Sequence, residues 1–199
     1  MSSGGPRARV KESPRRTQAQ RRAETRAAVL SSACRHFGSK GYAGTSLESI
    51  AHDCGLTIAP IYHYFENKRG LFEAVVEQMH DRILESLQSD STHRGVSGEA
   101  AWSAFLDLCS DPEFRRIVLV DAPIVLGRDR WAESAVYRAA GDLLRPGSDA
   151  LTDVERLERR MLLGALSEAA LTIAESDDPE RLAEQSEARV AKLLAAFRD

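Results

Sequence analysis

The segment GLTIAPIYHYFENK, residues 55–68, gathers side chains whose chemistry suits contact with a polyanion. Two tyrosines flank His63, so three rings with polar atoms follow one another. Lys68 and Arg69 then stand in the first turn of a predicted helix, where each positive charge opposes the helix dipole by about 0.3–1 kcal/mol. A phosphate bound by the free N–H groups and the lysine together would explain this placement. Two solvated charges on an exposed turn are the alternative.

Hydroxyl groups also stand where another helix is predicted to begin. Thr45 and Glu48 are three residues apart and precede an apolar run, which is the pattern of a capping box. Thr45 and Ser46 could bind a phosphate at this helix N-terminus, and for Thr45 a cap that never touches a phosphate is the alternative. Thr57 offers a further N-cap ahead of the tyrosine-rich segment.

Apolar residues at helical spacing predict the elements that position these side chains. Four helices follow, the first from 22 to about 38–41 and the others near 47–54, 58–64 and 68–88. Asn67 is the predicted cap of the fourth helix. Pro60 falls in the first turn of the third helix, where it removes no internal hydrogen bond. Two short helices joined by a glycine-containing turn have the spacing of a helix-turn-helix.

Charge divides the chain into a basic head and an acidic body. Residues 1–70 hold 12 Lys and Arg against 5 Asp and Glu, whereas the other 129 residues hold 15 against 25. Residues 1–20 are rich in Arg, Pro and Gly and have little to bury, so they are predicted to form a disordered basic arm. Such an arm could lie along phosphates, and a solvated tail is the alternative. The head therefore suits a polyanionic partner, which the body would repel.

Composition disfavours several classes of protein. No apolar run approaches the roughly 18 residues of a membrane span, and the basic N-terminus lacks the apolar stretch of a signal peptide. Cys34, Cys54 and Cys109 lack metal-ligand spacing and are predicted to be free thiols in a reducing, cytoplasmic setting. No nucleophile motif, paired metal ligands or glycine-rich phosphate loop indicates an enzyme, so neither a catalytic site nor a metal nor a cofactor is expected.

The rest of the chain is also predicted to be helical, with helices near 98–110, 113–127 with a break, 129–144, 152–175 and 179–198. Its large side chains could line an apolar pocket for a small molecule, although aromatics at helical spacing also serve as plain core. These side chains are Trp102, Phe105, Phe114, Trp131 and Tyr137. Asp121 is the odd polar residue among them. It could orient a ligand, or it could cap the helix that Pro123 opens.

Two C-terminal helices carry stripes that suit pairing with a second copy of the chain. Small residues on the first stripe would let two backbones approach closely, giving a four-helix bundle. The residues predicted at this interface are Leu157, Met161, Gly164, Ala165, Glu168, Val190, Leu193 and Phe197. Packing of both stripes against the chain's own core is the alternative.

Residues 26–71 contain a set of residues at many fixed spacings. They are Phe37, Gly41, Tyr42, Thr45, Ser46, Ile50, Ala51, Gly55, Leu56, Thr57, Tyr62, Phe65 and Lys68. In this pattern the segment resembles the N-terminal DNA-binding domain of the TetR family of bacterial transcriptional regulators. Ala59 and Pro60 depart from the pattern, because a glycine followed by a small residue is common at these positions. This departure bears on which operator is read and not on the kind of domain.

The resemblance implies an all-α protein of about nine helices. It would consist of the arm at 1–20, a three-helix DNA-binding domain at 21–70 and a helical ligand-binding and dimerisation domain at 71–199. The implied function is that of a repressor that binds a palindromic double-stranded DNA operator as a homodimer and is released by a small-molecule inducer. An all-α enzyme and a protein that coats DNA without sequence preference are the alternatives.

The resemblance also implies that the third helix enters the major groove. Ile58, Ala59 and Pro60 would approach base edges there. Thr57 and Tyr62 would lie on or near phosphates.

Two further residues of this helix, His63 and Tyr64, are candidates for DNA contact, with packing as the alternative for the tyrosines. Phe65 is expected in the core. Because the helix has no Arg, Asn or Gln, base readout would depend on van der Waals contact, on these two side chains and on DNA shape.

Overall fold

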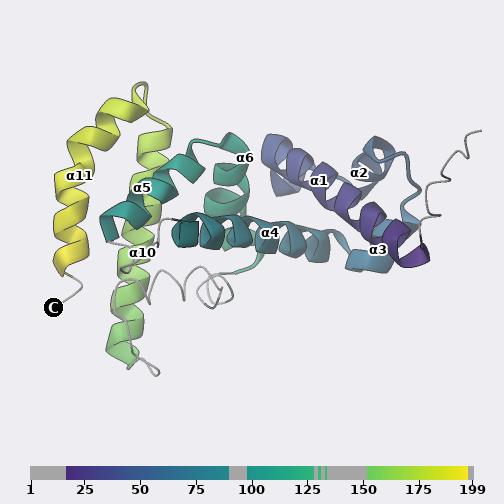
Figure 1. The fold of residues 1–199 in the computed structure, drawn as a ribbon, viewed down its shortest axis with the longest axis horizontal. Helices are drawn as coiled ribbons and strands as arrows, with labels where there is room; N and C mark the ends of the chain where they lie inside the picture. Colours follow the sequence, from purple (N-terminus) through teal and green to yellow (C-terminus); the bar gives the residue numbers. More distant parts are fainter. Residues whose placement is uncertain (1–16, 90–97, 128–129, 131–132, 134–151, 197–199) are drawn as a thin grey trace, which may run out of the picture.

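The computed structural model describes residues 17–89, 98–127, 130, 133 and 152–196, and the regular elements within them are helices (Figure 1). They are α1 (Gln18–Gly44), α2 (Leu47–Asp53), α3 (Ala59–Phe65), α4 (Lys68–Ser89), α5 (Gly98–Cys109), α6 (Pro112–Phe114), the π-helix η1 (Arg115–Asp121), α7 (Ala122–Val125), α10 (Asp153–Ala174) and α11 (Pro179–Ala196). The predicted all-α class is confirmed. The helix predicted near 129–144 lies almost wholly outside the described residues, as do residues 1–16.

α4 runs through the middle of the molecule and connects its two ends (Figure 1). α1, α2 and α3 gather at one end, and α5, α10 and α11 gather at the other. Between them lies the segment α6–η1–α7, which is the predicted broken helix of residues 113–127. No helix of the described ranges is both long and apolar enough to span a membrane.

α1 begins earlier than the apolar pattern predicts. Thr17 accepts a hydrogen bond from the Gln20 N–H, and the Gln20 side chain accepts one from the Thr17 N–H, which makes a complete capping box. Helix therefore includes residues 18–20, the last three of the predicted arm. At the other end, Gly41 leaves the helical conformation with φ 71° and ψ 170°, and helical residues resume after it up to Gly44.

The start of α2 corrects a predicted cap. Ser46, not Thr45, is the N-cap, and its hydroxyl accepts from the Ser49 N–H at 3.1 Å. Thr45 is buried beneath the end of α1, where its hydroxyl donates to the carbonyls of His36 and Gly41 at 3.0 and 2.9 Å. The capping box of Thr45 with Glu48 was wrong because the helix starts one residue later.

The start of α3 corrects a second cap, whereas the start of α4 agrees with the prediction. Ile58 is the N-cap of α3 and no side chain caps it, so Thr57 does not have that role. Ile58 already has a helical backbone, and Pro60 lies within the first turn, as expected. Asn67 accepts the Gly70 N–H through Oδ1 at 2.9 Å, which confirms it as the cap of α4.

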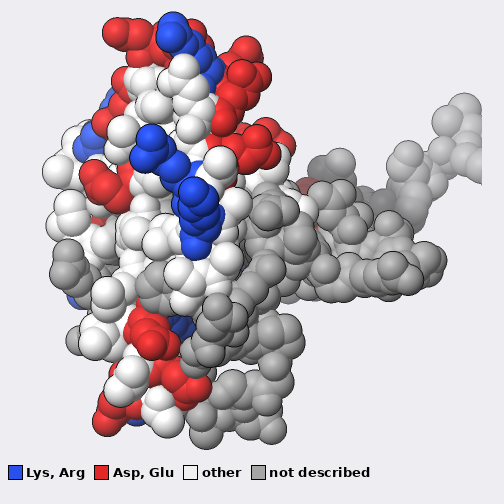
Figure 2. All heavy atoms as spheres, turned by 90° about the vertical axis from the view of Figure 1, so that its left-hand side faces the viewer, with Lys and Arg blue, Asp and Glu red and all other residues white. Residues whose placement is uncertain are grey.

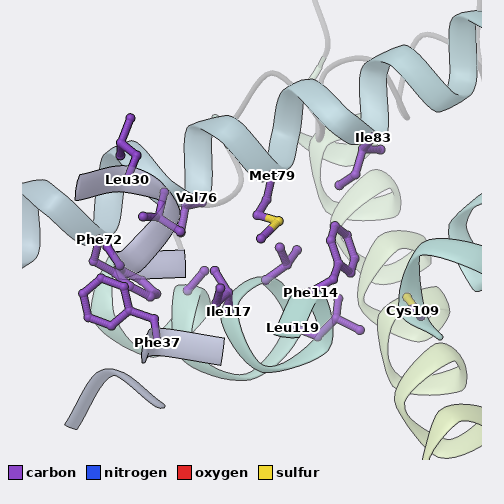
Figure 3. Close-up of a cluster of buried hydrophobic side chains, with 14 of the residues drawn as sticks. Leu30, Phe37, Phe72, Val76, Met79, Ile83, Cys109, Phe114, Ile117 and Leu119 are labelled. Carbon is purple, nitrogen blue, oxygen red and sulfur yellow. The ribbon is translucent and has the colours of Figure 1, made fainter. Parts of the chain in front are cut away.

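One hydrophobic core extends along α4 and joins both ends of the molecule. Near α1, the rings of Phe37 and Phe72 meet edge to face with centroids 5.0 Å apart. Farther along α4, Met79 points toward Ile117 and Phe114 of the α6–η1 segment (Figure 3). Because the same core packs against α1 and η1, these two elements are held against each other.

Candidate nucleic-acid interface

The helix-turn-helix is formed by α2, a turn at residues 54–58, and α3. Gly55 adopts φ 64°, which glycine tolerates without strain, and its N–H bonds to the His52 carbonyl at 3.0 Å. The Leu56 N–H reaches back to the Ala51 carbonyl at 2.9 Å. The turn is therefore fixed by main-chain hydrogen bonds at the end of α2.

α3 divides its side chains between the core and the surface. Ile61 and Phe65 lie four residues apart on one face and are buried, which confirms Phe65 as a core residue. Tyr62 is 49% exposed, and His63 is exposed beside it. The two inward side chains thus anchor the helix and turn the opposite face to solvent.

The other candidates of this segment are placed less uniformly. Thr57 and Ala59 are exposed, and Pro60 is half-buried. Ile58 and Tyr64 are half-buried and pack against the hydrophobic core. The structure therefore brings the predicted residues onto one short helix and its leading turn, with Ile58 and Tyr64 at the edge of the exposed face.

The two cations that follow α3 point to different partners. The Lys68 ammonium lies over the Tyr42 ring, 4.5 Å from its centroid. Arg69 instead pairs with Glu73 at 3.2 Å and donates to the Leu126 carbonyl at 3.4 Å, toward the end of α7. Lys68 stays a candidate for the DNA backbone, while Arg69 connects α4 to α7.

Polar contacts fix α2 against α1. Asp53, the last residue of α2, accepts the Ser32 hydroxyl at 2.6 Å and the Arg35 guanidinium at 2.7 Å. The hydrogen bond from Ser32, followed by the one from Arg35, lowers the pKa of Asp53 below its usual value. The ring Nδ1 of His36 lies 3.4 Å from the Ser49 hydroxyl. These contacts hold α2 against the middle of α1.

Burial disfavours the reactive thiolate form at two of the three cysteines. Cys34 and Cys54 are half-buried and Cys109 is buried, and all are free. Burial raises the pKa of Cys34 to about 11 and that of Cys109 to about 12, so both remain protonated at neutral pH.

The aromatic candidates of the body form a contiguous row. Trp102 lies 6.2 Å from Phe105, and Phe105 lies 6.5 Å from Phe114, measured between ring centroids. Trp102 and Phe114 are buried. Trp131 and Tyr137 lie outside the described residues. A role of this row in ligand binding stays a prediction.

Asp121 makes contacts that the sequence did not predict. Asp121 does occupy the N-cap position of α7, and Pro123 lies in the first turn, but the Asp121 side chain makes no capping hydrogen bond there. The buried carboxylate instead faces α1, where Oδ2 accepts the Tyr42 N–H at 2.7 Å and the Arg116 Nε–H at 3.3 Å. The only hint in the sequence is Gly41, which allows the chain to leave the helical conformation before Tyr42.

At the opposite end of the molecule, α10 exposes an apolar face. Val154, Leu157 and Met161 are 63%, 58% and 58% exposed. Further along the predicted stripe, the exposed residues are Gly164, Ala165 and Glu168. The buried residues of α10 are Leu162, Ala170 and Ile173. Among the described residues, this stripe of α10 therefore does not pack against the chain's own core.

The predicted stripe on α11 behaves differently. Val190 is only 7% exposed and Leu193 is half-buried, and both pack within the chain's own core. Val190 is therefore corrected from an interface residue to a core residue, because α11 uses this face to pack against α5 and α10. Phe197 lies outside the described residues. Figure 2 views this end and shows acidic side chains at its top and bottom and basic side chains near its centre and at its top.

A short exposed helix, anchored through a helix-turn-helix and joined by α4 to a helical body, defines a DNA-binding regulator of the helix-turn-helix class. Residues 29–75 match the family model described as bacterial regulatory proteins, tetR family. Residues 98–197 match the model of the tetracyclin repressor-like C-terminal domain, which covers half of the chain. The chain belongs to the TetR family.

Individual relatives agree with this assignment. The chain is similar to the transcriptional regulator TtgR of Pseudomonas putida, with 32% identity over 99 residues, 47% of each chain. It is 26% identical over 89 residues to IcaR, a negative transcriptional regulator of a biofilm operon in Staphylococcus aureus, covering 45% of this chain and 48% of IcaR. The chain thus matches just under half the length of these curated relatives.

A solved structure matches over a much larger share. A TetR-family transcriptional regulator from Pectobacterium atrosepticum is 35% identical, with 92% of this chain and 97% of that chain covered and a TM-score of 0.62. All three relatives are transcriptional regulators and not enzymes.

Proposed function

We propose that the protein is a ligand-responsive repressor that binds a palindromic operator in double-stranded DNA as a homodimer, in the cytoplasm, and that a small-molecule inducer releases it. The observation that supports the proposal is that α3 has one buried face and one exposed face. Its anchors Ile61 and Phe65 are buried while Tyr62 and His63 are exposed, so the helix has a rigid base and a free polar face. A short helix presented in this way suits the major groove.

The contacts to DNA follow from exposure. Thr57, Tyr62 and Ser46 offer hydroxyls to phosphates, and Ser46 does so at the N-terminus of α2, where free N–H groups favour an anion. Ala59, Pro60 and His63 face the bases, with Ile58 and Tyr64 at the margin. Thr45 keeps only an indirect role, because its hydroxyl is already donated within the protein. Lys68 supplies a charge to the backbone.

The inducer would bind in the body, beside the row of aromatic rings. Trp102 is 6% exposed, and within the described residues its indole N–H has no hydrogen-bond partner. A buried donor without a partner is costly, so an acceptor oxygen on a ligand would satisfy it. We therefore expect an apolar molecule that carries at least one hydrogen-bond acceptor.

The dimer would form through the exposed face of α10. An exposed patch of Val154, Leu157 and Met161 is unfavourable in water, and a second copy would cover it. The small residues Gly164 and Ala165 continue the same face and would allow close approach of the two backbones. Pairing at this end leaves both copies of α3 free to bind DNA.

Selection of DNA duplexes from a random library with the full-length protein tests the proposal. The expected product is an inverted repeat whose half-sites lie about one helical turn apart, roughly 34 Å. Affinity for that duplex should fall steeply as salt rises, because phosphate contacts release counterions. Retention of duplexes without any shared sequence would instead support a protein that coats DNA, and retention of none would refute DNA binding.

A further inference from the structure

A polar junction, centred on a buried hydrogen bond, connects η1 to the end of α1. The Asp121 carboxylate is 8% exposed, and its Oδ2 accepts the Tyr42 N–H at 2.7 Å. The same oxygen accepts the Arg116 Nε–H at 3.3 Å. Because Gly41 leaves the helical conformation, the N–H that follows it is donated to a group outside α1. Asp121 of the helical body thus binds the backbone N–H of Tyr42 in the DNA-binding end.

Two glycines of α1 let the body approach closely at this junction. The Arg116 guanidinium lies where a Cβ on Gly41 would stand, and the φ of 71° at Gly41 would strain any other residue. One turn earlier, a Cβ on Gly38 would meet the Glu113 side chain at 2.5 Å. The side chains of Glu113 in α6 and Arg116 in η1 therefore lie directly against the α1 backbone, so a shift of η1 would be transmitted to α1 through them.

The ring of Tyr42 connects this junction to Lys68, the candidate for contact with the DNA backbone. It stacks on Phe37 with centroids 5.9 Å apart and meets Phe72 edge to face at 5.1 Å. The Lys68 ammonium rests over the same ring at 4.5 Å from the centroid. One residue, Tyr42, is thus held at its backbone by Asp121 and supports with its ring the first residue of α4.

We propose that Asp121 is a positioning residue for DNA binding, because by holding the Tyr42 N–H it places the ring on which the Lys68 ammonium lies. The position of η1 then determines where Lys68 meets the DNA backbone. The proposal rests on the proposed role of Lys68 at a phosphate. It differs from simple packing, which would predict that loss of Asp121 affects stability alone.

The test is a double-mutant cycle with D121A and K68M in the full-length protein, using the selected duplex as the probe. Fluorescence anisotropy would give the affinity and its dependence on potassium chloride. K68M should weaken binding roughly tenfold and reduce the slope of log affinity against log salt by about 0.9 for each phosphate that is no longer neutralised. D121A should also weaken binding and reduce the salt slope. D121A added to K68M should have little further effect on the affinity or on the slope.

Two matched variants separate this role from general damage. D121N keeps an oxygen that can accept the Tyr42 N–H, so it should retain the wild-type salt slope. D111A removes an acidic side chain of the same segment that pairs with Arg82 of α4, so it should lower the melting temperature and leave the slope unchanged. Thermal melts would show that each variant is folded at the assay temperature.

Failure of the positioning role of Asp121 and failure of DNA binding would give different results. Equal losses from D121A in the wild-type and K68M backgrounds, or an unchanged slope in D121A, would overturn the positioning role while leaving DNA binding intact. A D121N variant that loses the slope as D121A does would overturn the role of the Tyr42 N–H. If the wild-type protein shows no salt-dependent binding to any duplex, the proposed function itself fails.

Discussion

The DNA-binding end and the α10 end of the molecule bury their apolar side chains to different extents. In α1, α2 and α3 the apolar side chains turn inward, and Tyr62 is the exposed large hydrophobic residue among them. In α10, three large apolar side chains remain more than half exposed. The first 70 residues are also basic, whereas the remainder is acidic. The first end thus suits a polar, negatively charged partner, and the second suits an apolar one.

The largest expected effect comes from the core of the DNA-binding end. Phe37 is fully buried between Tyr42 and Phe72, so Phe37→Ala should destabilise the protein by about 3–5 kcal/mol through reduced burial and a cavity. Urea denaturation followed by circular dichroism would measure it. Ile124→Ala removes an apolar side chain that is 78% exposed and should change stability by at most about 0.5 kcal/mol. Similar losses of stability in both variants would contradict the difference in burial between the two side chains.

The next effect concerns the exposed face of α10. Met161→Arg would place like charges opposite each other in the proposed dimer and should weaken association roughly 10- to 100-fold, or about 1.4–2.8 kcal/mol. Sedimentation velocity would show a shift from dimer to monomer. Because Met161 is 58% exposed, the monomer should keep its helical circular dichroism spectrum. A variant that stays dimeric would place the interface elsewhere.

Another effect depends on pH and involves His80 of α4. Burial lowers the pKa of His80 to about 4, below the ordinary value of 6.5, so the folded state favours the neutral imidazole. The resulting stability is present above pH 6.5 and is lost as the pH falls toward 4. The free energy of unfolding should decline by at most about 1.4 kcal/mol per pH unit in this interval.

The matched variants for this prediction are His80→Phe and His52→Gln. His80→Phe should flatten the decline between pH 6.5 and 4, measured by chemical denaturation at each pH. His52 is exposed, and its replacement should leave the profile unchanged. An unaltered profile in His80→Phe would assign the acid sensitivity to carboxylates instead.

The smallest effect separates capping from DNA contact at Ser46. Ser46→Ala should cost about 1 kcal/mol of stability, because the Ser49 N–H loses its acceptor. Ser46→Asp caps the helix equally well and should keep the stability, yet it places a negative charge where a phosphate is expected. Its affinity for the selected duplex should fall roughly tenfold, by about 1.4 kcal/mol. Unchanged affinity in Ser46→Asp would remove this N-terminus from the interface.

Local patterns predicted most of the helices. The cap of α4 at Asn67 and the start of α11 at Pro179 were predicted correctly, because helix periods and end signals depend on a few neighbouring residues. Thr45 and Ser46 were confused, since both adjacent hydroxyls can cap a helix and only the tertiary fold decides which one is buried. The early start of α1 was missed because the capping box at Thr17 precedes the apolar stripe rather than belonging to it.

Contacts between distant segments were harder to predict. Asp121 lies 79 residues from its partner Tyr42, and nothing in the local sequence of either residue identifies the other. Val190 and Met161 both lie on helical apolar stripes, but one faces the core and the other faces solvent. A stripe shows that a face is apolar, and the packing of the whole chain determines what covers it.

Hydroxyl-radical footprinting on the selected duplex tests most directly the central claim that one end reads DNA while the other pairs the chains. Wild-type protein should protect two segments about one helical turn apart, and Met161→Arg should lose the paired protection at concentrations where the wild type is saturated. Continuous protection by the wild type, or an unchanged paired footprint with a Met161→Arg protein shown to be monomeric, would contradict the account.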